Sequence, residues 1–305
     1  PYSCEDYKTF AELPALKDGA ADATLVALLD DPDTKIQSLA AHALRSDGRA
    51  YRIDTALAEK VVAKLEAGKG DDSLLENLAQ AAGAVDADKT KLGPRLLELA
   101  KKIAKPNVRA SFISSGQFHN SDLLYPVTAE LARSEPNEEL RRAAIGSFWV
   151  GTPSDKHDEV CQLWVSIGSD PKTPENLASS ALDYAAWNPS ACDKQFEAIG
   201  KVLDKKLKGK IEESSWVSAG SHLLGQDKLP KPLKKKVVGL LQTVANESKN
   251  NSMPRIYAMD GVVRGDPAAG KALVAKLSKD KDEYVKKHAI EAAAEAAAKA
   301  TAKKN

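Results

Sequence analysis

A short helical phrase recurs along this chain at intervals of roughly 31–39 residues, and this repeat constrains the fold more than any other feature. Eight copies can be aligned. Their first positions are Ile36, Leu74, Val108, Leu140, Leu177, Ser215, Pro254 and Val285. A self-similar period of this length is typical of stacked supersecondary units, each of which contacts only its neighbours. The sequence therefore predicts a repeat array rather than a closed domain.

The aligned copies share one face of an α-helix. If the first residue is position zero, then positions zero, four and eight form a stripe along that face. Position four is Ala in six copies, at Ala40, Ala144, Ala181, Ala219, Ala258 and Ala289. Small residues at the centre of a stripe allow a neighbouring helix to approach closely. Positions two, six and nine point away from the stripe, so we expect them on the exposed surface.

A second apolar helical segment precedes each phrase, and turn residues separate the two. These first segments are 25–29, 57–65, 92–103, 123–132, 160–167, 196–207, 233–244 and 268–277. The separating turns contain Pro with Asp or Asn, as in Asp31-Pro32-Asp33 and Glu135-Pro136-Asn137. Pro ends one helix, and Asp or Asn caps the next. Each unit is therefore predicted to be helix, tight turn, helix.

The clearest unit is Leu25–Leu44, where Leu-Leu-Asp-Asp-Pro-Asp runs into Ile-Gln and Ala-Ala-His-Ala-Leu. This pattern resembles the HEAT-like helical repeats of the HEAT/armadillo type. The resemblance implies an all-α, right-handed α-solenoid of about eight stacked HEAT-like pairs, and it is nearly silent on activity. Position one is often Arg in such repeats. Here it is basic only at Arg109, Arg141, Arg255 and Lys286, which implies an incomplete ladder of charges between repeats.

The domain organisation follows from the repeat. The array is expected over residues 20–297, because no Gly/Ser-rich or Pro-rich linker divides it. Residues 1–19 are predicted to cap the first unit, since Tyr7, Phe10 and Leu13 recur at a spacing of three. Residues 298–305 form a charged C-terminal tail. No apolar run approaches the length of a spanning helix, so no membrane span is expected.

Charge is distributed unevenly along the chain. Residues 1–193 carry 21 Lys and Arg against 30 Asp and Glu, a net −9, whereas residues 194–305 carry 23 against 13, a net +10. The densest basic cluster is Lys231, Lys234, Lys235 and Lys236. A nucleic-acid-binding role for this half is therefore an alternative. The predicted exposed positions do not form a continuous basic stripe, however, so a nucleic-acid partner is not favoured.

The three cysteines, Cys4, Cys161 and Cys192, are too few for a disulfide scaffold and too far apart for a metal knuckle. A Cys161–Cys192 bridge is conceivable, because equivalent helices of adjacent units lie side by side. The axial match is expected to be poor, which argues against it, and the state of Cys4 stays open. The chain begins at Pro1, and removal of an export signal is one ordinary cause; this favours a periplasmic or extracellular protein over a cytoplasmic one.

The sequence offers no clear catalytic constellation. The segment Gly265–Ala272 has the spacing of a phosphate-binding loop, but it has Ala272 where Ser or Thr should hold magnesium, and it follows a helix. The five histidines never lie within four residues of each other, and none lies within three residues of a cysteine. We therefore expect no metal, no cofactor and no enzymatic activity.

The tryptophans mark the most promising surface. Trp149, Trp164, Trp187 and Trp216 all lie in the fourth to sixth units, and Trp164 is expected in the core. Trp149 and Trp187, with Tyr184 nearby, either anchor a partner chain or fill the groove between units. The candidate partner-binding residues are Arg142, Trp149, Asp183, Tyr184, Trp187 and Trp216.

These observations favour a non-catalytic scaffold that binds a partner protein or peptide on the concave surface of the second helices. Two alternatives remain: a nucleic-acid-binding repeat protein that uses the basic C-terminal half, and a structural component of a larger envelope or surface assembly.

Overall fold

The structure is a computed structural model, and it describes residues 20–46, 49–187, 192–211 and 213–302. Cys4, the predicted capping segment 1–19 and residues 303–305 lie outside the described residues. The described part of the chain contains α-helices and two short 3₁₀ helices, η3 (Ser154–Lys156) and η4 (Asp193–Gln195), and no strand. Two compact units, residues 1–156 (unit 1) and 157–305 (unit 2), are described separately below.

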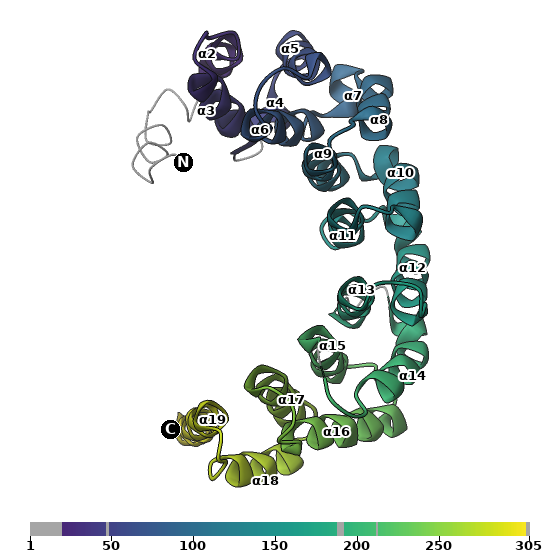
Figure 1. Cartoon of the computed structure of the whole chain (residues 1–305), viewed down its shortest axis with the longest axis vertical. Helices are drawn as coiled ribbons and strands as arrows, with labels where there is room; N and C mark the ends of the chain where they lie inside the picture. Colours follow the sequence, from purple (N-terminus) through teal and green to yellow (C-terminus); the bar gives the residue numbers. More distant parts are fainter. Residues whose placement is uncertain (1–19, 47–48, 188–191, 212, 303–305) are drawn as a thin grey trace. The chain divides into compact units, whose positions relative to one another are not determined.

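Within the described residues, unit 1 consists of four helical pairs, two short α-helices and the 3₁₀ helix η3 (Figure 1). The pairs are α2 (Ala20–Leu28) with α3 (Thr34–Arg45), α5 (Thr55–Ala67) with α6 (Asp72–Gly83), α8 (Gly93–Lys102) with α9 (Pro106–His119), and α10 (Ser121–Ser134) with α11 (Glu138–Ser147). The short helices α4 (Arg49–Arg52) and α7 (Ala87–Thr90) follow the second helices of the first two pairs. Within the described residues, this part of the chain matches the predicted units one to four.

Unit 2 also consists of four pairs within the described residues. They are α12 (His157–Ser169) with α13 (Glu175–Trp187), α14 (Phe196–Lys206) with α15 (Ser214–Leu224), α16 (Lys231–Asn246) with α17 (Ser252–Gly265), and α18 (Pro267–Leu277) with α19 (Glu283–Ala302). Helix α19 continues to Ala302, so the helical part extends beyond position 297.

Each unit has two layers of helices. The first helices of successive pairs contact one another and form one layer. This layer contains α2, α5, α8 and α10 in unit 1, and α12, α14 and α16 in unit 2. Helix α18 continues the layer of unit 2 (Figure 1). The second helices, α3, α6, α9 and α11 in unit 1 and α13, α15, α17 and α19 in unit 2, contact one another along the other. We call these the first-helix layer and the second-helix layer.

The repeated stripe packs as predicted. The residues at position four are almost completely buried in all eight copies, with at most 2% of their surface exposed at Leu78 and none at Ala144 or Ala181. Position eight is also buried in every copy except the last, where Ala293 is exposed. The close approach of the second helices therefore depends on these small side chains.

Side-chain caps define the turns between paired helices. Asp33 accepts a hydrogen bond from Lys35 N at the start of α3, and Asn137 accepts one from Leu140 N at the start of α11, at 3.0 Å. Asp282 accepts hydrogen bonds from Tyr284 N and Val285 N at the start of α19. Each cap satisfies backbone N–H groups that have no partner inside the helix. The predicted turn chemistry is confirmed at these positions.

The arginines at position one bind main-chain carbonyl oxygens rather than forming a simple ladder of charges. Arg109 donates from Nε to Ala100 O at 2.6 Å, and Arg141 donates from Nε to Ala132 O at 3.0 Å. Both acceptors lie in the last turn of the first helix of the same pair. Carbonyl groups there lack helical partners, so a cation at this place both satisfies and neutralises them.

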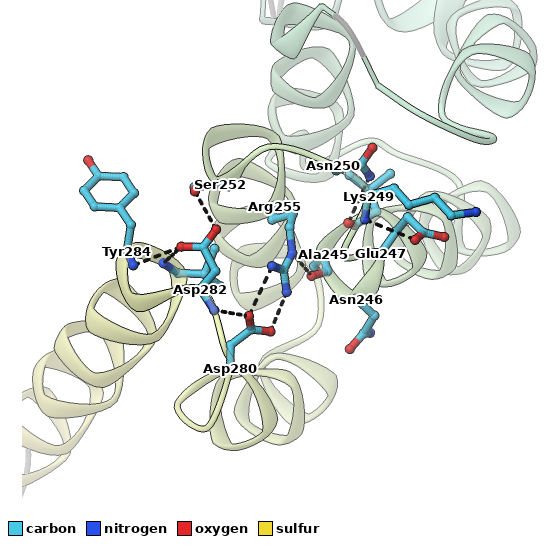
Figure 2. A network of polar contacts seen from close by, with 12 residues as sticks. Ala245, Asn246, Glu247, Lys249, Asn250, Ser252, Arg255, Asp280, Asp282 and Tyr284 are labelled. Carbon is cyan, nitrogen blue, oxygen red and sulfur yellow. Dashed lines mark hydrogen bonds and ion pairs between the residues drawn. The ribbon is translucent and has the colours of Figure 1, made fainter.

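Arg255 adds a connection to the next repeat, which Figure 2 shows. Its Nε donates to Ala245 O at 3.0 Å, and its Nη1 and Nη2 both bind the carboxylate of Asp280, in the turn before α19. Arg255 is 3% exposed. The same turn is fixed by Ser252, whose Oγ donates to Asp282 Oδ2 at 2.7 Å. A paired and nearly buried guanidinium therefore joins α16, α17 and the α18–α19 turn.

A disulfide joins the first two repeats of unit 2, which corrects the expectation of a poor axial match. Cys161 and Cys192 are bonded, with Cα atoms 5.3 Å apart. Cys192 does not lie inside the next helix. It directly precedes η4, so the chain passes beside α12 before α14 begins. Both cysteines are fully buried.

Candidate functional site

The second-helix layer of unit 1 is covered by interlocked polar side chains. Asn77 Nδ2 donates to Ser38 Oγ at 3.0 Å, which connects α6 to α3. Arg45 Nη1 donates to Gln80 Oε1, and Gln80 Nε2 donates to Ser111 Oγ at 3.4 Å, which connects α3, α6 and α9. These groups hold one another across adjacent repeats.

The second-helix layer of unit 2 presents an aromatic group instead. Trp187, the last residue of α13, stacks on His222 of α15 with ring centroids 4.7 Å apart and an interplanar angle of 18°. His222 Nδ1 lies 2.8 Å from Asp183 Oδ1, one turn earlier on α13. Trp187 remains 48% exposed despite this stacking. We call Asp183, Trp187 and His222 the Trp187 platform.

A buried amide holds the main chain beneath this platform. Gln226 directly follows the C-cap of α15, and its Nε2 donates to Ala186 O at 2.8 Å and to Trp187 O at 3.4 Å. Gln226 is 9% exposed. The last carbonyl groups of α13 therefore have partners from the neighbouring repeat. The indole ring is thus fixed through its own stacking and through the helix end that carries it.

Two of the predicted partner-binding residues, Tyr184 and Trp216, do not belong to the Trp187 platform. Tyr184 is half-buried and stacks on the fully buried Trp164, with centroids 5.9 Å apart. Trp216 is 2% exposed; its Nε1 donates to Glu175 Oε1, and Lys206 Nζ lies 4.9 Å from its ring centroid. This burial corrects the expectation that Trp216 offers its ring to a partner. Position one, which carries Arg in other repeats, is filled here by an indole.

Arg142 and Trp149 belong to unit 1 and are described apart from the platform. Arg142 is exposed on α11, and Trp149 is half-buried just after that helix. The next residue, Val150, is 52% exposed. Unit 1 has its own aromatic cluster, in which Tyr51 and Phe118 both contact His119 at centroid distances of 5.2 and 4.7 Å.

The predicted exposed positions require a correction. Position two is buried in several copies, including Ser38, Ser179, Val217 and Ile256. A second helix packs against its own first helix and against second helices on both sides, so its exposed strip is narrower than a simple amphipathic pattern predicts. Some residues at positions six and seven, such as Asp183 and His222, remain partly exposed.

His222 is the platform residue that sequence reasoning did not select. The aligned positions did not mark it, because His222 at position seven meets position six of the preceding second helix, whereas Gln80 and Asp260 at position six meet position three of the next one. A related pair occurs further along, where His288 Nε2 of α19 lies 3.4 Å from Asp260 Oδ2 of α17. Burial raises the pKa of Asp260, and the nearby His288 partly opposes that shift.

The other candidate sites have simple structural explanations. In Gly265–Ala272, Gly265 ends α17 and Asp266 caps α18 by accepting from Ala268 N and Ala269 N. A carboxylate already occupies the place where a phosphate would bind. Within the described residues, no group of three or more His, Cys, Asp or Glu side chains is arranged to hold a metal ion. None of the described helices is both long and apolar enough to cross a membrane.

Comparison with known proteins identifies the fold. No family model and no curated protein matches this sequence. Two crystal structures of importin beta, from a polyethylene glycol and an ammonium sulfate condition, align with 93% of this chain at TM-scores of 0.55 and 0.56. Their sequence identities to it are 10% and 14%, and the chain spans only 46% and 44% of their lengths.

An engineered protein also aligns, over 94% of this chain and 90% of its own, at 14% identity and a TM-score of 0.36. The importin beta likeness and the two layers of paired helices define the class of protein: the chain is an all-α helical-repeat protein of the solenoid class.

Proposed function

We propose that this protein is a non-catalytic, HEAT-like scaffold that binds a partner protein or peptide through the second-helix layer of unit 2. The proposal rests on the environment of Trp187. This side chain is 48% exposed, yet its ring is held by stacking on His222. Large aromatic side chains are enriched among the residues that dominate interface energies. A ring that is already ordered loses little conformational entropy when a partner binds.

The charges around the platform favour a basic anchor on the partner. Helix α13 carries Glu175 and Asp183, and neither α13 nor α15, both described in full, contains Lys or Arg. An indole face also attracts a cation, by about 0.5–2 kcal/mol depending on exposure. Glu175 is at the other end of α13 and already pairs with Lys206, so the acidic group near the ring is Asp183. An Arg or Lys side chain flanked by apolar residues therefore matches the ring and this carboxylate.

The acid–histidine pair has a positioning role in this proposal, not a catalytic one. Asp183 binds His222 Nδ1, and the imidazole face is covered by the Trp187 ring. These contacts fix the orientation of the indole. The HEAT-like assignment is supported by the alanines at position four and by the Asp and Asn caps of the turns.

The disulfide supports a location for the scaffold. Disulfides persist in oxidising compartments and are rare where thiols are kept reduced. The bond between Cys161 and Cys192 lies in the same two repeats that form the Trp187 platform. The proposal therefore includes an oxidising environment, outside the cytoplasm.

Selection of peptides from a random display library, followed by affinity measurement, tests this function. Peptides selected on the wild-type protein are expected to contain Arg or Lys beside apolar residues. Their affinity should fall at least about tenfold in Trp187→Ala, which corresponds to about 1.4 kcal/mol. The matched control is Phe118→Ala, which removes a 58% exposed aromatic ring from unit 1. Equal affinity for the Trp187→Ala variant and the wild type would refute the proposed surface.

A further inference from the structure

Unit 2 separates its charge from its aromatic surface. Helices α14, α16 and α18 of the first-helix layer carry nine lysines: Lys201, Lys205, Lys206, Lys231, Lys234, Lys235, Lys236, Lys271 and Lys276. The same helices contain two acidic residues, Glu197 and Asp204, and both are on α14. The second helices α13 and α15 carry no basic residue along their described length. The other two second helices, α17 and α19, do carry basic residues, so the separation holds between the lysine-bearing first helices and the two second helices that form the Trp187 platform.

Eight of these lysines lie on neighbouring first helices, and we call them the lysine face; Lys206 is excluded because it pairs with Glu175 of α13 and lies over the Trp216 ring. Helices α14 and α16 contact each other, and Lys276 of α18 lines a cavity of about 420 Å³ together with Gln242 and Thr243 of α16. Lys231, Lys235, Lys236 and Lys271 are exposed. Asp204 adds little negative potential, because Lys208 and Lys236 bind its carboxylate at 3.1 and 3.2 Å.

The composition of this face discriminates between anionic partners. Among the described side chains of α14, α16 and α18, no large hydrophobic residue is exposed. Those helices also contain no arginine. Protein interfaces are enriched in aromatic residues and Arg and depleted in Lys. Single-stranded nucleic acids bind through stacked aromatics, and base edges in duplex DNA are read most often by Arg.

A surface of lysines alone suits a partner with diffuse negative charge. The ammonium group is a compact, hydrated point charge on a flexible stem, and it does not require a shaped acceptor. Clusters of four to eight basic residues are attracted to anionic lipid headgroups without insertion of a helix. We propose that the lysine face of unit 2 docks the protein on an anionic lipid surface, leaving the Trp187 platform on the opposite layer accessible.

Vesicle co-sedimentation with the full chain tests this proposal. The probe is vesicles of phosphatidylcholine with or without phosphatidylglycerol. We expect binding only to the vesicles with phosphatidylglycerol, and loss of binding as salt rises from about 0.1 M to about 1 M, because the screening length falls from about 10 Å to about 3 Å. No sedimentation with the anionic vesicles at low salt would overturn the proposal.

Matched triple variants locate the surface. The substitutions Lys231→Gln, Lys235→Gln and Lys271→Gln together should lower partitioning onto anionic vesicles on the order of 100-fold, while the control set Lys60→Gln, Lys69→Gln and Lys101→Gln in unit 1 changes it far less. Equal losses in both sets would overturn the assignment to this face. Tighter retention of an oligonucleotide than of anionic vesicles would also overturn it, in favour of a nucleic-acid partner. Trp187→Ala should leave vesicle binding unchanged, which separates this test from that of the proposed function.

Discussion

The two units share one repeat and buried amide connections between repeats, but unit 2 adds two connections of a different chemistry. In unit 1 the buried connections are uncharged: Asn120 donates to Gly83 O and Val85 O, both at 2.9 Å, and Gln117 binds Gly151 O and Thr128. Unit 2 has buried amide connections of the same kind, in which Gln226 donates to Ala186 O and Asn250 accepts from Ile211 N, and it adds a disulfide and the nearly buried Arg255–Asp280 pair. The repeat pattern therefore determines where the helices form, but it does not determine which side chains connect one repeat to the next.

This difference has consequences for how each unit responds to its surroundings. Hydrogen bonds between neutral groups are insensitive to reductant and to moderate acid. A disulfide is lost under reducing conditions, and an ion pair is lost when its carboxylate is protonated. We therefore expect redox state and pH to affect unit 2 more than unit 1. Site-resolved hydrogen exchange separates the two responses, because it reports on each unit in the same sample.

Arg255→Met should have the largest effect on unit 2. Removing one partner of a buried ion pair costs about 3–5 kcal/mol, because the other charge is left without compensation. The loss of stability in Arg255→Met is expected at the lower end of this range, because the side chain of Asp280 is 19% exposed. The control Arg264→Met removes an exposed arginine from the same helix and should be nearly silent. Equal effects of the two substitutions on exchange in α16 to α19 would contradict the assigned role of Arg255.

The same pair predicts a pH dependence with a defined sign. Hydrogen bonds from Arg255 hold the pKa of Asp280 below its ordinary value. The stabilisation is therefore fully present above the unfolded pKa of about 3.9, and it is lost as pH falls through the lower folded value. Unfolding of the wild type should become easier in that acidic range, and Arg255→Met should lose this component of the pH dependence.

Removal of the disulfide should have the next largest effect on the stability of unit 2. The bridge closes a loop with a sequence separation of 31 residues, for which chain entropy gives about 3–4 kcal/mol. Reductant, or Cys161→Ala with Cys192→Ala, should speed exchange in α12 to α15 and leave the four pairs of unit 1 unchanged. Slowed or unaltered exchange in α12 to α15 would contradict a stabilising bridge.

Overpacking should affect both units equally, because the repeat itself is common to them. Ala144 and Ala181 occupy position four in unit 1 and unit 2, and neither has exposed surface. Replacement of either alanine by leucine should destabilise its own unit by about 1–3 kcal/mol. A thermally silent substitution at either position would show that the helices are not closely packed there.

Trp187→Ala should cost less stability than the loss of a buried tryptophan, about 1–2 kcal/mol, because nearly half of the residue is already in water. The contrasting substitution is Trp164→Ala, which removes a fully buried indole and should cost about 3–5 kcal/mol. A similar fall in melting temperature for both variants would place Trp187 among the core residues and remove it as a partner anchor.

The helical pairs could be predicted from sequence because they depend on local signals. The position-four alanines and the Asp or Asn caps lie within each repeat, and their spacing is visible in the chain. The residues in contact across repeats were harder to predict. The Cys161–Cys192 bond depends on the path of the chain before η4, and the burial of Trp216 depends on Glu175 and Lys206 from neighbouring elements.

The candidate site was predicted only in part for the same reason. Asp183 and Trp187 were selected because of their residue types, and they do lie together. His222 was not, because its significance comes from its neighbours on the preceding helix. A comparison of equivalent positions in successive second helices pairs Asp183 with Ser221 and not with His222. The predicted exposure of position two ignored the packing of second helices on both sides.

If a partner binds the Trp187 platform, fluorine NMR of protein labelled with fluorotryptophan detects the contact at that ring. Single Trp→Phe variants assign the resonances of Trp149, Trp164, Trp187 and Trp216. On titration with a selected peptide, the Trp187 resonance should shift most, while those of the buried Trp164 and Trp216 change little. A saturable titration that moves the Trp149 resonance and leaves that of Trp187 in place would contradict binding at the platform and assign binding to unit 1.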